Sequence, residues 1–304
     1  MQAPLARSIA ALAGRSDPAI IMLHGYRYAP GDPVHCPHRT LMSPDDNLGW
    51  PAPLGLWENG AGCGIAFGWA ARGSLRRSHL RARAHGRELA QIVSLLRATA
   101  PERPVHVIAH SLGTEIALSA LAHLGRGAVD RLLLLTGASH QSHAEAMLST
   151  PAGRDAEVVN VTSRENDLFD AAFERLVPSG LRCDGAIGRG IAAPNALTLQ
   201  IDCRRSLDAL ERLGIGIAPP QGRISHWSSY TRPGLMDFYA RLMRTPETLP
   251  LSLLQSILPS EADRRWSRIL PATPPLPRPR LPRSLRSAVR MPRAAQASGS
   301  CSTA

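Results

Sequence analysis

Six short, largely apolar runs alternate along the chain with stretches in which apolar residues recur at helical spacing. Apolar runs of this length are typical of strands that are buried on both faces. The longer stretches, with one apolar and one polar face, are typical of helices that cover a sheet. The alternation predicts a mostly parallel sheet flanked by helices. The expected strands are residues 19–23, 64–69, 105–109, 131–135, 157–162 and 196–201, and the expected helices are residues 82–98, 206–213 and 234–243.

One strand-to-helix junction carries a pattern that suggests chemistry. The stretch Val105–Leu118 reads V-H-V-I-A-H-S-L-G-T-E-I-A-L, which is an apolar strand, a turn and an amphipathic helix. Ser111 is at the tip of the turn, where a strained backbone exposes its Oγ. Ala109 and Gly113 are small enough to avoid collisions with the neighbouring elements. The helix directs its free N–H groups toward Ser111, and the N–H of Leu112 is a candidate oxyanion donor.

This junction resembles the nucleophile elbow of the serine hydrolases in the α/β-hydrolase superfamily. That superfamily usually has glycine at the first small position, where this chain has Ala109. The resemblance implies a single α/β-hydrolase domain over residues 1–265, with Ser111 as the nucleophile. Few residues precede the first strand, so a reduced sheet of about six strands is expected. The short connection between Leu135 and Glu157 leaves no room for a large cap domain.

The resemblance also implies roles for residues elsewhere in the chain. His24-Gly25 directly follows the first strand, and in the superfamily this places a second oxyanion donor on the next residue, Tyr26. The expected chain order of the catalytic residues is serine, acid, histidine. This order assigns Asp167 as the acid that orients the imidazole, and His226 as the general base.

Other carboxylates compete with Asp167 for the role of the acid. Glu165 and Asp170 lie in the same segment. A solvated loop carboxylate or a helix cap would give the same pattern. Asp202, at the end of the last expected strand, is the main alternative.

The predicted reaction is the hydrolysis of a small-molecule carboxylic ester through an acyl-enzyme. Thioesterase, acyltransferase and lipase activities would use the same residues, and a catalytically silent binding module is a further alternative. Loops at 26–61, 167–195 and 227–230 are expected to wall an open, apolar pocket, which favours short or medium acyl groups. No organic cofactor is expected. No metal is expected either, since the His35-Cys36-Pro37-His38 stretch has the wrong spacing for a metal site.

Three other histidines are expected to be surface residues. His79 lies near the start of a predicted helix, and His140 and His143 lie in a polar stretch. The sequence places no acid where it would pair with His140 or His143. We therefore expect none of the three to take part in the chemistry.

The net charge of +11 is concentrated near the C-terminus, where residues 271–304 contain six arginines and no acid. A Pro/Arg-rich tail, residues 266–304, is expected to be disordered. The rest of the chain is only mildly basic and has no basic patch interleaved with aromatics, so no nucleic-acid partner is expected. No apolar run is long enough to span a bilayer. Residues 1–16 lack the apolar core of a signal peptide, and the five cysteines are scattered, so a reducing cytoplasm is expected.

Overall fold

The computed structural model describes residues 9, 17–43, 49–56, 62–260 and 263. All of them belong to one compact unit, Met1–Ile269. The predicted disordered tail, residues 266–304, lies outside the described residues.

The described residues form a six-stranded sheet in which every pair of neighbouring strands is parallel, in the order β2-β1-β3-β4-β5-β6. This confirms the predicted α/β-hydrolase fold with a reduced, parallel sheet. Only two short helices connect β4 to β5, and they form no cap domain. The strands are β1 (Ala19–Leu23), β2 (Cys63–Phe67), β3 (Val105–His110), β4 (Arg131–Leu135), β5 (Glu157–Thr162) and β6 (Ala196–Gln200).

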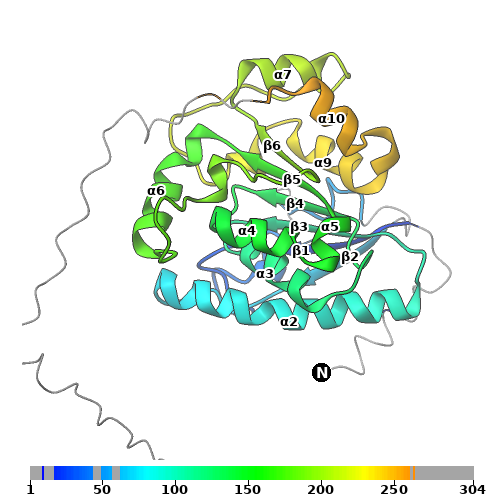
Figure 1. Cartoon of the computed structure of the whole chain (residues 1–304), viewed down its shortest axis with the longest axis vertical. Coiled ribbons are helices and arrows are strands. Elements are labelled where there is room, and N and C mark those ends of the chain that lie inside the picture. Colours follow the sequence, from blue (N-terminus) through cyan, green and yellow to red (C-terminus); the bar gives the residue numbers. More distant parts are fainter. Residues whose placement is uncertain (1–8, 10–16, 44–48, 57–61, 261–262, 264–304) are drawn as a thin grey trace, which may run out of the picture. The chain divides into compact units, whose positions relative to one another are not determined.

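Helices cover both faces of this sheet (Figure 1). Alternate residues of each strand pack on opposite sides: Ile21 and Leu23 of β1 join the core under α2 and α3, whereas Ile20 and Met22 join the core under α9 and α10. The two cores explain why the strands are apolar at nearly every position. The helices are α2 (Leu75–Thr99), α3 (Gly113–Ala120), α4 (Gln141–Leu148), α5 (Pro151–Asp155), α6 (Asp167–Leu176), α7 (Arg204–Glu211), α8 (Ser228–Thr231), α9 (Leu235–Arg244) and α10 (Leu251–Ile257).

The helix predicted at 82–98 is longer than its apolar periodicity indicated. It begins at Leu75, and the Ser74 side chain caps it by accepting a hydrogen bond from the N–H of Arg77 at 3.4 Å. The first turns are rich in arginine, so they add little to the apolar face. The sequence analysis did not anticipate α10, a helix of two turns that buries only Leu251 and Leu254.

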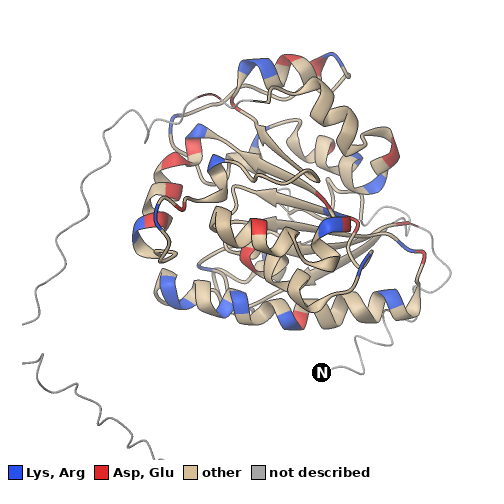
Figure 2. Cartoon of the chain, in the orientation of Figure 1, with Lys and Arg blue, Asp and Glu red and all other residues tan. Residues whose placement is uncertain are grey.

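Most charged residues lie on the helices and loops, and the strands carry few (Figure 2). Arg131 of β4 is an exception, because it is buried and donates to the Leu242 carbonyl at 2.7 Å. Among the described residues, no helix combines the length and the apolar character needed to cross a bilayer.

The strand order defines where a ligand would bind. The chain leaves β1 for the edge strand β2 and then returns to β3, on the other side of β1. Ligands of open parallel sheets bind at such a point, outside the carboxyl ends of the strands. The register pairs Leu23 with Ala109, so the residues that follow β1 lie beside those that follow β3.

Candidate active site

Ser111 occupies the tight turn between β3 and α3. Its φ is +54°, in the left-handed region that a residue with a side chain rarely adopts. Its N–H donates to the Leu135 carbonyl at 3.1 Å, and its carbonyl accepts from the N–H of Ala138 at 2.9 Å. A Cβ at Gly113 would lie 2.7 Å from the carbonyl oxygen of Leu23, so only glycine lets α3 begin this close to β1.

The structure brings His226 to Ser111 across 115 positions of sequence. His226 Nε2 lies 2.8 Å from Ser111 Oγ, and its Nδ1 lies 2.6 Å from Oδ1 of Asn166. Asn166 Nδ2 in turn donates to Asp170 Oδ1 at 3.0 Å. A carboxylate only accepts hydrogen bonds, so this last contact fixes the orientation of the amide. The Asn166 oxygen therefore accepts a hydrogen bond from the N–H at His226 Nδ1, which leaves the lone pair of Nε2 facing Ser111.

The residue in contact with His226 Nδ1 is thus Asn166, not the predicted Asp167. A 3₁₀ turn, Arg164–Asn166, follows β5 and directs the Asn166 side chain toward the imidazole. Asp167 is the next residue and the first of α6, where it is buried. The sequence order predicts an acid in this segment and does not distinguish adjacent residues. An asparagine is also not an acid, so a search for carboxylates passes over it.

Of the three competing carboxylates, Asp170 contacts Asn166, and the other two pair with arginines. Asp202 Oδ2 accepts from Arg164 Nε at 2.5 Å. Glu165 forms a buried ion pair with Arg232. Both carboxylates therefore hold the loops around the site together and do not contact the imidazole.

His226 is held in a largely apolar environment. The Phe169 ring stacks on the imidazole with centroids 4.7 Å apart. The backbone carbonyl of His226 lies 3.0 Å from His110 Nε2 and accepts from Thr136 Oγ1 at 3.3 Å. Burial lowers the pKa of His226 well below 6.5, and the nearby His110 lowers this pKa further. The imidazole is therefore neutral at neutral pH, as a general base requires.

His110 is a site residue that the sequence analysis did not identify. It precedes Ser111 at the end of β3 and is buried. Burial lowers its pKa to about 4, although its hydrogen bond with the His226 carbonyl opposes that shift. The neutral ring then donates Nε2–H to that carbonyl and holds the His226 backbone against the turn. A polar residue in an otherwise apolar strand, next to the serine, is the signal that could have identified it.

The segment after β1 approaches Ser111 closely. A Cβ at Gly25 would lie 2.7 Å from Ser111 Cβ, so this position requires glycine. His24 anchors the segment to the end of β2, since its Nε2 accepts from the N–H of Trp69 at 3.0 Å. Burial lowers the pKa of His24 to about 4, which keeps the ring neutral for this contact. Within the described part of the chain, the N–H groups of Tyr26 and Leu112 donate no backbone hydrogen bond.

The prediction that His79, His140 and His143 are surface residues is wrong. His79 and His140 are buried, and His143 is partly buried. Both His79 Nε2 and His143 Nε2 lie 3.3 Å from Oε1 of Glu115, which is buried in α3 and also pairs with Arg83. Burial would raise the pKa of Glu115, but these neighbours lower it to about 2. A glutamate in the otherwise apolar start of α3 indicates such partners, because a buried charge requires them.

The described residues contain no group of three or more histidines, cysteines or acids with the geometry to hold a metal ion. The cluster of Glu115, His79 and His143 is therefore not a candidate metal site.

Residues 39–166 match the model of a family described as an alpha/beta hydrolase of unknown function (DUF900). The matched segment includes Ser111 and Asn166 and ends before His226. No curated protein matches the chain. The match covers less than half of the chain; together with the parallel sheet and its flanking helices, it shows an α/β-hydrolase fold.

Proposed function

We propose that the protein is a serine hydrolase that cleaves a carboxylic ester through an acyl-enzyme. The observation that carries this proposal is the chain of contacts from Ser111 Oγ to His226 Nε2 at 2.8 Å and from His226 Nδ1 to Asn166 Oδ1 at 2.6 Å. A serine in a strained elbow, bonded to a neutral and oriented imidazole, is the arrangement that activates a hydroxyl for acyl transfer.

In the proposed reaction, Ser111 Oγ attacks the ester carbonyl carbon while His226 Nε2 takes its proton. The backbone N–H groups of Tyr26 and Leu112 stabilise the oxyanion of the tetrahedral intermediate. His226 then gives the proton to the leaving alcohol oxygen as the ester C–O bond breaks. A water molecule, deprotonated by the same imidazole, then attacks the acyl carbon. The bond from this carbon to Ser111 Oγ breaks, the carboxylic acid leaves, and His226 returns the proton to Oγ.

Asn166 takes the orienting role that the sequence order assigned to Asp167. It holds the imidazole in the tautomer with the proton on Nδ1, as asparagine does in the cysteine proteases of the papain type. Asp170 fixes the direction of the amide through its bond to Nδ2. Asp170 is therefore a positioning residue, one hydrogen bond removed from the imidazole.

The test is covalent labelling with a fluorophosphonate, followed by peptide mapping and ester hydrolysis assays. Labelling of Ser111, and its loss together with turnover in Ser111→Ala, is the expected result. Ser119→Ala is the matched control, because Ser119 is similarly buried but lies at the far end of α3 and contacts His143. A native protein that is folded but not labelled would favour a silent binding module.

The orienting residue is tested separately. Asn166→Ala should lower kcat by about 10²-fold or more, since the imidazole loses its alignment. Asp167→Asn and Asp202→Asn should lower kcat far less, since neither carboxylate is the group bonded to His226 Nδ1. A larger loss in Asp167→Asn than in Asn166→Ala would return the role to Asp167. Parallel assays on oxygen esters and thioesters of the same acyl group would decide between esterase and thioesterase.

The cysteines bear on the cellular location that we propose. Cys36, Cys63, Cys183 and Cys203 are free thiols. Free cysteines fit a reducing compartment, so we place the enzyme in the cytoplasm.

A further inference from the structure

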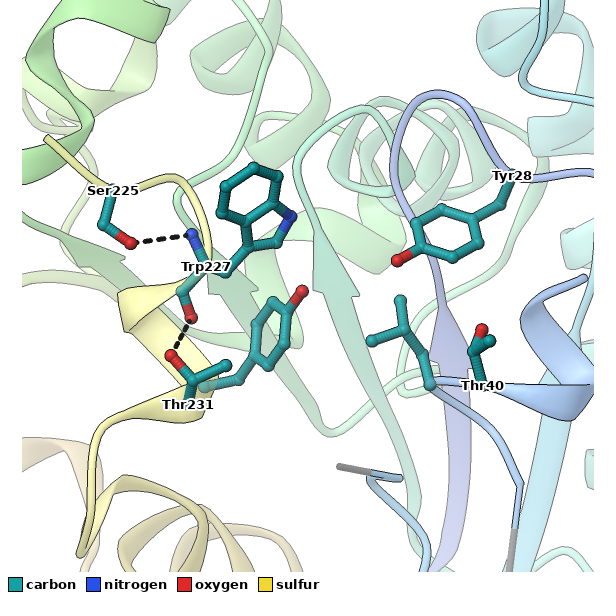
Figure 3. Close-up of a pocket in the computed structure, with 7 residues that line it drawn as sticks. Tyr28, Thr40, Ser225, Trp227 and Thr231 are labelled. Carbon is teal, nitrogen blue, oxygen red and sulfur yellow. Dashed lines mark hydrogen bonds between the residues drawn. The ribbon is translucent and has the colours of Figure 1, made fainter. Parts of the chain in front are cut away.

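A cavity of about 480 Å³ lies between the loop that carries His226 and the segment that follows β1. Tyr28 and Thr40 form one wall, and Trp227 and Thr231 face them from the other (Figure 3). Leu41 and Tyr230 also line it. Five of these six residues come from two of the three loops predicted to line a pocket, and Thr231 directly follows one of them; the loop at 167–195 contributes none.

This cavity adjoins the candidate active site. Trp227 follows His226 directly, and their ring centroids are 6.2 Å apart. The Tyr230 ring packs edge-on against His110 at 5.0 Å, and His110 is the residue before Ser111. A group bound in the cavity would therefore lie beside the loop that carries His226, the residue proposed to protonate the leaving oxygen.

The residues that line the cavity favour the binding of an uncharged ring. No charged side chain lines the cavity, so an ionised group would lose its hydration there without gaining a counter-ion. Three aromatic rings offer flat apolar surfaces, against which another ring packs well. Burial raises the pKa of Tyr28 and of Tyr230, so both hydroxyls stay protonated and can donate to an acceptor oxygen.

The size of the cavity argues against a small aliphatic group. A volume of about 480 Å³ is within the range of sites for whole small molecules, and a methyl or ethyl group would fill little of it. The hydroxyls of Thr40 and Thr231 each donate a hydrogen bond of 3.0 Å to a backbone carbonyl, that of Cys36 and that of Trp227 respectively. A ligand can therefore contact only their methyl groups and the oxygen lone pairs.

We infer that the cavity lined by Tyr28, Trp227 and Tyr230 binds the alcohol portion of the ester, and that this portion is an uncharged aromatic or alicyclic ring. This inference rests on the proposed ester hydrolysis at Ser111. It adds which end of the substrate is recognised, and by what chemistry.

The kinetic test fixes the acyl group as acetyl and varies the alcohol. We expect kcat/KM for 2-naphthyl acetate to exceed that for phenyl acetate by about tenfold or more, mainly through KM, because a further ring is buried in an apolar pocket. 4-Carboxyphenyl acetate should be a poorer substrate than phenyl acetate. Equal kcat/KM values across the three esters, with Ser111 still labelled, would overturn the inference and leave the proposed function intact.

A pocket-filling variant gives the test a structural control. Thr40→Phe should remove the preference for the naphthyl ester, whereas Thr248→Phe, the same change at an exposed threonine outside the cavity, should preserve it. Methyl 2-naphthoate carries the ring on the acyl side instead. If Thr40→Phe impaired only this ester, the cavity would hold the acyl group and our assignment to the alcohol would be wrong.

A binding measurement keeps the inference testable without turnover. Equilibrium dialysis of 2-naphthol against the Ser111→Ala protein should show saturable binding that Thr40→Phe weakens and Thr248→Phe does not. Equal binding to all three proteins, or none to any, would refute the cavity as a ring site. This outcome is independent of whether Ser111 is a nucleophile.

Discussion

The buried ion pair between Glu165 and Arg232 connects the loops that carry Asn166 and His226. Only 4% of the Glu165 side chain and 1% of the Arg232 side chain are exposed. Arg232 Nη1 also donates to the Ile201 carbonyl at 2.8 Å, and the N–H of Ser225 donates to the Glu165 carbonyl at 2.9 Å. Removing either partner should therefore affect both stability and the alignment of the site.

Arg232→Met is the decisive perturbation, since it leaves the Glu165 carboxylate buried without a cation. Loss of one partner of a buried pair costs about 3–5 kcal/mol of unfolding free energy. For a domain of this size, that cost corresponds to a fall in Tm of about 6–20 °C. The assay is urea unfolding followed by tryptophan fluorescence, together with a thermal melt. kcat should fall in step, because the loop next to His226 loses its anchor.

Two further variants make this prediction refutable. Glu165→Leu combined with Arg232→Met removes both charges and should regain most of the lost stability, as replacement of buried pairs by apolar groups often does. Arg204→Met breaks the exposed pair with Asp208 on α7, in which 89% of the arginine side chain is exposed, and should change stability little. If the double variant were as unstable as the sum of the single variants, the two residues would not be coupled and the reasoning would be wrong.

Three other predictions follow from the geometry. Asn166→Asp places a carboxylate against His226 Nδ1, which raises the pKa of the imidazole. The pH below which kcat/KM falls is expected to lie well below 6.5 in the native protein and should move upward in this variant. Asp167→Asn should leave that pH unchanged. Gly25→Ala forces a Cβ to within 2.7 Å of Ser111 Cβ and should lower kcat more than it raises KM. The same clash should lower the unfolding free energy, measured by urea titration, by about 1–3 kcal/mol. An unchanged kcat would mean that the segment after β1 is not part of the oxyanion site. Folding lowers the pKa of Glu115 from 4.5 to about 2, so its contribution to stability is full above pH 4.5 and is lost as the pH falls toward 2. Glu115→Gln should therefore be less stable than the native protein at pH 7 and should lose less stability on acidification. Parallel slopes of unfolding free energy against pH for the two proteins would contradict the account of a buried, paired charge.

The sheet could be predicted from the sequence because each strand is buried on both faces and is therefore apolar at almost every position. β4, with Arg131 followed by four leucines, is an example. The elbow could be predicted because the close approach of α3 to β1 requires the small residue at Gly113. Such constraints are local in the sequence, so a pattern of a few residues reveals them.

The rest of the site depends on contacts between distant segments. Asn166 reaches His226 through the geometry of a single 3₁₀ turn, and a shift of one residue there changes which side chain faces the imidazole. Glu115 meets His79 of α2 and His143 of α4 only because three helices pack on the same face of the sheet. Neither of these contacts can be inferred from composition or from the spacing of residues in the sequence.

In a Ser-His-Asp triad, the carboxylate both orients the imidazole and compensates the charge of the imidazolium. A neutral amide such as Asn166 can do only the first of these. Asn166 accepts a hydrogen bond from His226 Nδ1 without adding a negative charge at contact distance, and burial keeps the pKa of the imidazole well below 6.5, so that in the proposed reaction the ring is free to accept the Ser111 proton. The imidazolium that forms in the reaction still needs a compensating charge. We propose that Asp170 supplies it from the far side of the amide, since its Oδ1 accepts a hydrogen bond of 3.0 Å from Asn166 Nδ2. Asp170→Asn should therefore lower kcat while leaving KM nearly unchanged, because the imidazolium exists only during the chemical steps.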